Sequence, residues 1–156
     1  MHKPVIKDGC MYFGASNGYL YFFNPRTGVQ KWATDIDSQN LFGTSSKPIV
    51  DGDRIYLSNV ASQNSGNNGS VLCLDLNGNI EWVTQVCGNS TRDYPQTSMI
   101  LCNDTLCLKQ SNDFYLLNKT SGTVEFQTSF ENYLLSPVVD GNAIYAVGDM
   151  KVLVFS

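Results

Sequence analysis

Short apolar and aromatic runs alternate with polar turns rich in Asp, Asn and Gly along the whole chain. In the first part of the chain this pattern predicts strands at 4–6, 10–14, 19–23 and 29–34. The turns that separate them contain Asp8-Gly9, Asn17-Gly18 and Thr27-Gly28. Such dipeptides between apolar runs are typical of β-hairpins. We therefore expect the four strands to form one antiparallel meander.

The same order of strands and turns recurs three more times. The second unit predicts strands at 48–50, 54–58, 70–76 and 79–85, the third at 99–101, 105–109, 114–117 and 123–129, and the fourth at 136–139, 143–147 and 151–155. The fourth unit stops where its last strand is expected. Serial four-stranded meanders predict an all-β protein with propeller-type blades, here about three and three-quarter blades, a partial or half propeller. We expect one domain, 1–156, with blades at about 4–35, 48–86, 98–130 and 136–156.

A glycine followed four residues later by a large aromatic residue marks the end of each of the first three units. The pairs are Gly28 and Trp32, Gly78 and Trp82, and Gly122 and Phe126. A spacing that returns at regular intervals is the signature of a repeat architecture. The glycine permits a tight turn, and we expect the aromatic residue to pack between neighbouring blades.

Composition and charge narrow the classes of function. The 156 residues are 42% hydrophobic and only 15% charged, below the roughly 25% that is usual for soluble domains. The net charge is −4, and the ten Lys and Arg residues are scattered, so the electrostatic signature of nucleic-acid binding is missing. No apolar run reaches the length of a membrane-spanning helix, so we expect no membrane insertion.

Side chains suited to catalysis or metal binding are few. His2 is the single histidine, and the five cysteines show no CxxC spacing, which disfavours histidine-dependent catalysis, nucleophilic triads and zinc sites. The carboxylates of Asp35, Asp37, Asp93 and Glu131 fall near predicted strand ends, where metal ligands are possible, but we interpret them as solvated loop residues. We expect no catalytic, metal-binding or cofactor-binding residue.

The repeats resemble the PQQ-type propeller repeat, also called the quinoprotein or tryptophan-docking repeat. Its turn motif is matched by Phe22, Asn24, Thr27, Gly28 and Trp32, by Asp75, Gly78 and Trp82, and by Asn118, Ser121, Gly122 and Phe126. Its leading strand is matched by Pro48, Asp51, Gly52 and Tyr56, and by Pro137, Asp140, Gly141 and Tyr145. Phe126 departs from the motif, because it has no indole N–H to donate.

The resemblance implies a fold more strongly than it implies an activity. The family contains PQQ-dependent alcohol and sugar dehydrogenases, a periplasmic scaffold lipoprotein of the outer-membrane assembly machine, and repeat domains attached to other enzymes. A dehydrogenase needs PQQ on the axis of a closed ring, a calcium ion with oxygen ligands and a carboxylate base. Many also carry an adjacent Cys-Cys pair, which this chain lacks. The resemblance also implies a periplasmic or extracellular location.

We therefore expect a non-catalytic structural or protein-interaction module, with a fragment of a PQQ-dependent dehydrogenase as the alternative. PQQ and calcium are expected only under that alternative. Possible contact residues are Phe42, Arg92, Tyr94 and Tyr133, together with the polar, glycine-rich stretch 59–69. The module would belong to a larger propeller or would associate with a second copy, because two copies supply enough blades for a ring of roughly eight.

Overall fold

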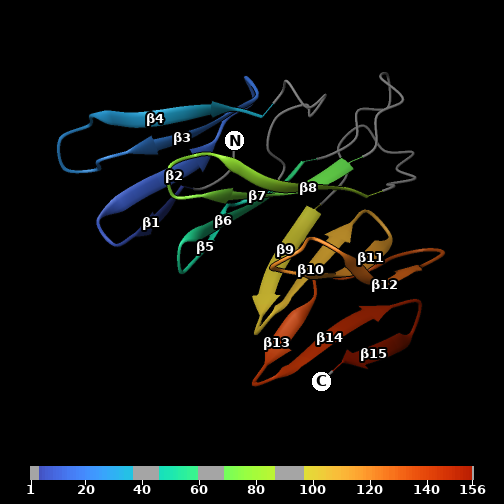
Figure 1. Ribbon diagram of the computed structural model, residues 1–156. Helices are drawn as coiled ribbons and strands as arrows, with labels where there is room; N and C mark the ends of the chain where they lie inside the picture. The colour runs from blue at the N-terminus through green and yellow to red at the C-terminus, as the bar shows by residue number, and fades with distance from the viewer. Residues whose placement is uncertain (1–3, 37–45, 60–68, 87–96, 156) are drawn as a thin grey trace.

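Fifteen β-strands in four antiparallel sheets make up the part of the chain that the structure, a computed structural model, describes, and this part contains no helix (Figure 1). The described residues are 4–36, 46–59, 69–86 and 97–155. The ends of every strand lie within two residues of the predicted ends. The strand pattern predicted from the alternation of apolar runs and turns is confirmed.

Each sheet is a meander of strands that follow one another in sequence. The first contains β1 (Val5–Lys7), β2 (Cys10–Gly14), β3 (Tyr19–Phe23) and β4 (Gln30–Asp35). The second contains β5 (Ile49–Asp51), β6 (Arg54–Asn59), β7 (Gly69–Asp75) and β8 (Ile80–Val86). The third contains β9 (Thr97–Cys102), β10 (Thr105–Gln110), β11 (Asp113–Asn118) and β12 (Val124–Ser129). The fourth contains β13 (Val138–Asp140), β14 (Ala143–Gly148) and β15 (Lys151–Phe155).

The sheets follow one another like the blades of a fan (Figure 1). The first strands of neighbouring sheets lie together: β1 contacts β5, and β9 contacts β13. Lys7 Nζ also donates a hydrogen bond to the carbonyl of Val50 at 3.0 Å, which joins β1 to β5. The first strand of each meander therefore forms the inner edge, and the last strand forms the outer edge.

Three apolar clusters fill the spaces between successive sheets. Between the first and second sheets lie Tyr12, Leu20, Ile55, Leu57, Leu72 and Leu74. Between the second and third sheets lie Tyr56, Val71, Cys73, Leu106, Leu108, Tyr115 and Leu117. Between the third and fourth sheets lie Cys107, Phe114, Leu116, Ile144 and Ala146. Each strand alternates its side chains between two faces, so a sheet in the middle of the series is apolar on both faces.

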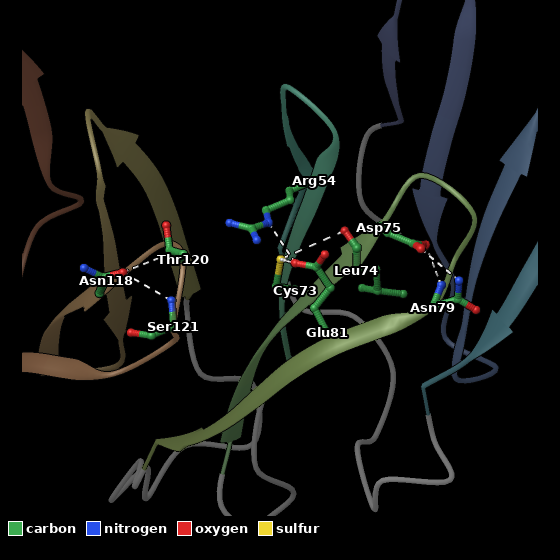
Figure 2. A network of polar contacts seen from close by, with 9 residues as sticks. All are labelled: Arg54, Cys73, Leu74, Asp75, Asn79, Glu81, Asn118, Thr120 and Ser121. Carbon is green, nitrogen blue, oxygen red and sulfur yellow. Dashed lines mark hydrogen bonds and ion pairs between the residues drawn. The ribbon is translucent and has the colours of Figure 1, made fainter.

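The turn before the fourth strand is built in the same way in each of the first three sheets. The side-chain oxygens of Asn24 and Asn118 each accept hydrogen bonds from the backbone N–H groups two and three residues later, at 2.9–3.4 Å. Asp75 Oδ1 accepts from the N–H groups of Asn77 and Asn79, both at 2.8 Å, and Figure 2 shows the contact between Asp75 and Asn79. These Asx turns explain why Asn or Asp stands at this position in each of these three units.

The strand register also shifts at the same place in these three sheets. Phe22 pairs with Trp32, Cys73 pairs with Trp82, and Leu116 pairs with Phe126, and each pairing is followed by a β-bulge. A bulge adds one residue to one strand and changes the direction of the neighbouring side chains. The repeat therefore includes a backbone irregularity that aims its aromatic residue in the same way each time.

Candidate protein-interaction surfaces

The aromatic residue of the first unit lies on the turn of the second sheet. Trp32 Nε1 donates a hydrogen bond to the carbonyl of Leu76 at 2.9 Å, and Thr34 Oγ1 donates to the carbonyl of Gly78 at 2.7 Å. Gly78 has a φ of 86°, and a Cβ at this position would lie 2.9 Å from the Trp32 ring and 2.5 Å from Thr34 Oγ1. The glycine is therefore required both by the turn and by the close approach of the neighbouring sheet.

The same contact recurs between the second and third sheets. Thr84 Oγ1 donates to the carbonyl of Gly122 at 2.6 Å, and a Cβ on Gly122 would lie 2.5 Å from the Trp82 ring. Trp82 differs from Trp32 in one respect: its Nε1 is buried and has no hydrogen-bond partner in the described part of the chain. This tryptophan therefore docks by packing, without the indole hydrogen bond.

Between the third and fourth sheets an aromatic pair takes the place of the tryptophan contact. The ring of Phe126 lies 4.9 Å from that of Phe155, and Phe155 also stacks on Phe114 at 5.7 Å between centroids. Phe126 is 36% exposed. Gly28 also differs from the later glycines, because nothing lies within 4 Å of a Cβ built on it. Its φ of 70° still serves the turn, but no preceding described sheet presses on it.

Lys119, on the turn between the third and fourth strands of the third sheet, contacts two carboxylates at turns between first and second strands, one in the second sheet and one in the third. Lys119 Nζ lies 3.1 Å from Asp51 Oδ2 and 3.2 Å from Asp104 Oδ1, and these hydrogen bonds raise the pKa of Lys119. All three groups are at least partly exposed, so the pairs contribute modestly to stability. Only the pair of Lys119 and Asp51 joins the second sheet to the third, because Asp104 belongs to the same sheet as Lys119.

The cluster in the described residues that most resembles a reactive site is Arg54, Glu81 and Cys73 (Figure 2). Arg54 Nε lies 2.7 Å from Glu81 Oε2, which in turn lies 3.6 Å from Cys73 Sγ. Burial, and then the nearby Glu81 carboxylate, raise the pKa of Cys73 to about 12. A thiol with so high a pKa is protonated at neutral pH, and only the thiolate is nucleophilic. This arrangement is that of a structural cysteine.

The other candidate chemical groups are dispersed. Cys10, Cys73, Cys102 and Cys107 are free thiols, and burial raises the pKa of Cys107 to about 12. Asp35 and Glu131 are exposed, and no group of three His, Cys, Asp or Glu side chains that suits a metal ion occurs among the described residues. His2, Asp37, Cys87 and Asp93 lie outside the described residues.

Of the predicted contact residues, the structure describes Tyr133. Tyr133 is 43% exposed, and its hydroxyl accepts a hydrogen bond from the N–H of Met150, which is 95% exposed. Asp149 anchors this segment by accepting from the N–H groups of Glu131, Asn132 and Tyr133 at 2.5–3.3 Å. Although desolvation opposes the effect, these donors lower the pKa of Asp149. The predicted contact residues Phe42, Arg92 and Tyr94, and the stretch 60–68, lie outside the described residues.

The outer faces of the first and last sheets are apolar surfaces, and neither was assigned to particular residues from the sequence. On the first sheet, Ile6, Met11, Phe13, Tyr21 and Phe23 lie on the face turned away from the second sheet. On the fourth sheet, Val138, Tyr145, Val147, Val152 and Val154 lie on the face turned away from the third. Alignment of the repeats would have identified both sets, because the equivalent positions in the middle sheets are core residues.

Sheets stacked by repeated aromatic contacts around their first strands define this chain as a β-propeller protein. No family model matches it. The chain is 30% identical over 150 residues to the outer membrane protein assembly factor BamB of Salmonella typhimurium, which aligns with 94% of this chain and 34% of BamB. Its repeats and this relative make the chain similar to propellers built from PQQ-type repeats. The chain spans about a third of the length of this curated relative.

Solved structures agree on the fold. BamB from Moraxella catarrhalis superposes with a TM-score of 0.64 at 17% identity, over 98% of this chain and 41% of that one. A quinohemoprotein alcohol dehydrogenase, ADHIIG from Pseudomonas putida, superposes with a TM-score of 0.69 at 11% identity, over 94% of this chain and 32% of that one. At these identities the similarity establishes the architecture, which a BamB protein and a dehydrogenase share.

Proposed function

We propose that this chain is a non-catalytic protein-interaction module built from PQQ-type propeller blades. The observation that carries the proposal is the 30% identity, along almost the whole chain, with an assembly factor. The blades supply a rigid scaffold, because each middle sheet is buried on both faces. Function would then reside in surfaces that the scaffold presents to other proteins.

A role in the assembly of outer membrane proteins, with a periplasmic or extracellular location, is the biological setting that the similarity to BamB supports for this proposal. In the described part of the chain, no helix is long and apolar enough to cross a membrane.

The first partner to test in this proposal is a second copy of the chain. Both end sheets present apolar faces, with Ile6 65% exposed on one and Val138 60% exposed on the other. Exposed apolar faces of this kind mark interaction sites or aggregation sites. Mass measured by light scattering after size exclusion tests the proposal. We expect about 34 kDa, twice the 17.2 kDa of one chain; a folded monomer at high concentration contradicts self-association.

The alternative, a fragment of a PQQ-dependent dehydrogenase, has support only at the level of the fold. The decisive experiment adds PQQ and Ca²⁺ to the purified chain and follows dye-linked oxidation of alcohols and sugars. We expect no rate above that of PQQ and Ca²⁺ without protein. A rate that saturates with substrate and scales with the amount of protein would overturn the non-catalytic proposal.

A further inference from the structure

We call forward the face that each sheet turns toward the next sheet in sequence, and backward the opposite face. In each of the three internal interfaces, the forward face of one sheet packs against the backward face of the next. Tyr12 and Tyr56 lie on forward faces, each eight residues after a proline, and both are almost completely buried by the next sheet. Tyr145 stands eight residues after Pro137, at the same position of the fourth sheet. It is only half-buried, because no described sheet covers it.

The forward face of the fourth sheet is a continuous apolar surface. The strand register aligns Val138, Tyr145 and Val154 in one row across β13, β14 and β15, and pairs Val147 with Val152 beside it. Val152 and Val154 are 59% and 57% exposed. The row of three is equivalent to Val5, Tyr12 and Phe22 in the first sheet, which the register aligns in the same way. The residues on this face are therefore of the kind found on faces that pack against another sheet.

The backward face of the first sheet is the complementary surface. Met11, Phe13, Tyr21 and Phe23 occupy the positions of Ile55, Leu57, Leu72 and Leu74 in the second sheet, and those four have no exposed area. In the first sheet the aromatic rings stack on one another instead, with Phe13 5.3 Å from Tyr21 and 5.6 Å from Phe23 between centroids. All four side chains remain partly exposed.

We infer that the forward face of the fourth sheet binds the backward face of the first sheet in a second copy of the chain. This inference rests on the self-association proposed above and specifies which surfaces meet. Valines on one side and large aromatic rings on the other can interdigitate, and neither row contains a charged residue. Because the two faces differ, two copies related by a two-fold axis form the contact twice and close a ring of eight sheets.

The internal interfaces indicate which residues of the two copies meet. Val154 is equivalent to Phe22, Cys73 and Leu116, and Tyr21 is equivalent to Leu72, Tyr115 and Leu153. Phe22 and Leu72 belong to one cluster, Cys73 and Tyr115 to the next, and Leu116 and Leu153 to the third. By the same rule, Val154 of one copy lies near Tyr21 of the other.

Two charge substitutions, studied alone and mixed, test this pairing. In Tyr21→Lys each of the two contacts has a lysine on its aromatic side, and in Val154→Glu each has a glutamate on its valine side. We expect either variant alone to dimerise more than about 100-fold less tightly, since both contacts then bury an unpaired charge. Val29→Glu, a matched change at an exposed turn residue outside both faces, should leave the dissociation constant within about 3-fold of the original.

Mixing the two variants in equal amounts separates the inference from its alternatives. In a dimer of one Tyr21→Lys copy and one Val154→Glu copy, one of the two contacts is unmodified. The other contact places the introduced lysine opposite the introduced glutamate. We therefore expect a heterodimer by light scattering and by native mass spectrometry. Recovery on mixing also shows that both variants are folded.

Two outcomes overturn the inference while leaving self-association intact. If only one variant weakens the dimer, like faces pair; if the mixture stays monomeric, these faces do not meet. A monomeric unmodified chain overturns self-association itself, so the two failures are distinguishable.

Discussion

The buried faces of the middle sheets and the open faces of the end sheets carry the same residue pattern in different environments. Leu72 and Tyr21 stand at equivalent positions, yet Leu72 is completely buried and Tyr21 is partly exposed. Every sheet therefore carries apolar residues on both faces, including the two end faces that no described sheet covers. What a side chain contributes to stability depends on its place in the series as much as on its identity.

The largest difference between the two environments should appear on truncation to alanine. Leu72→Ala removes a side chain from the core between the first and second sheets, and we expect a loss of about 2–5 kcal/mol in the free energy of unfolding. Val154→Ala, on the open face, should cost less than about 0.5 kcal/mol at a concentration where the chain is monomeric. Urea denaturation measures both values. Equal losses would contradict the distinction between covered and open faces.

The glycines allow the same comparison through backbone strain. Gly78→Ala places a Cβ against Trp32 in addition to the cost of a positive φ, so we expect a loss of about 2–4 kcal/mol. Gly28→Ala meets only the cost of its positive φ, about 1–2 kcal/mol, because the space around it is open. The urea midpoints of the two variants show which substitution costs more stability. A larger loss at Gly28 than at Gly78 would show that the contact with Trp32 is not tight.

The two tryptophans separate packing from hydrogen bonding within the covered interfaces. Trp32→Phe loses the hydrogen bond to Leu76, and we expect it to cost about 0.5–1.5 kcal/mol beyond the effect of the smaller ring. Trp82→Phe removes a buried N–H without a partner in the described part of the chain, so its cost should be smaller. Thermal unfolding of both variants gives the comparison. A greater loss at Trp82 would show that its indole N–H is bonded in solution.

The smallest expected effect concerns the segment that leads into the fourth sheet. The pKa of Asp149 is lowered in the folded chain, so the charged form contributes stability above its unfolded pKa and loses it as the pH falls through the folded pKa. Asp149→Asn keeps a side-chain oxygen but loses the charge. We expect the variant to be less stable than the original at pH 7, with the difference shrinking below about pH 4. A difference that grows toward acid pH would contradict this assignment.

The positions of the strands and turns were predictable because they depend on local chemistry. Asn24, Asp75 and Asn118 form Asx turns with their own neighbours, and the glycines that follow adopt positive φ within the same turns. The contact residues were harder to predict. Of those proposed from the sequence, the described part of the chain contains Tyr133 and the two ends of the stretch 59–69, and the two open faces were not assigned to residues beforehand. A strand shows only its alternation, and exposure depends on what stands next to the sheet.

Repeat order, turn chemistry and the apolar character of both sheet faces are properties of the sequence itself, because they arise from interactions within a unit of about forty residues. Tertiary structure decided which copies of that pattern became core. It buried Tyr12 and Tyr56 and left Tyr145 only half-buried, and it gave Trp32 a hydrogen-bond partner that Trp82 lacks among the described residues. The physical reason is that burial and hydrogen bonding between sheets require a neighbour at a defined distance, and no local pattern encodes whether that neighbour is present.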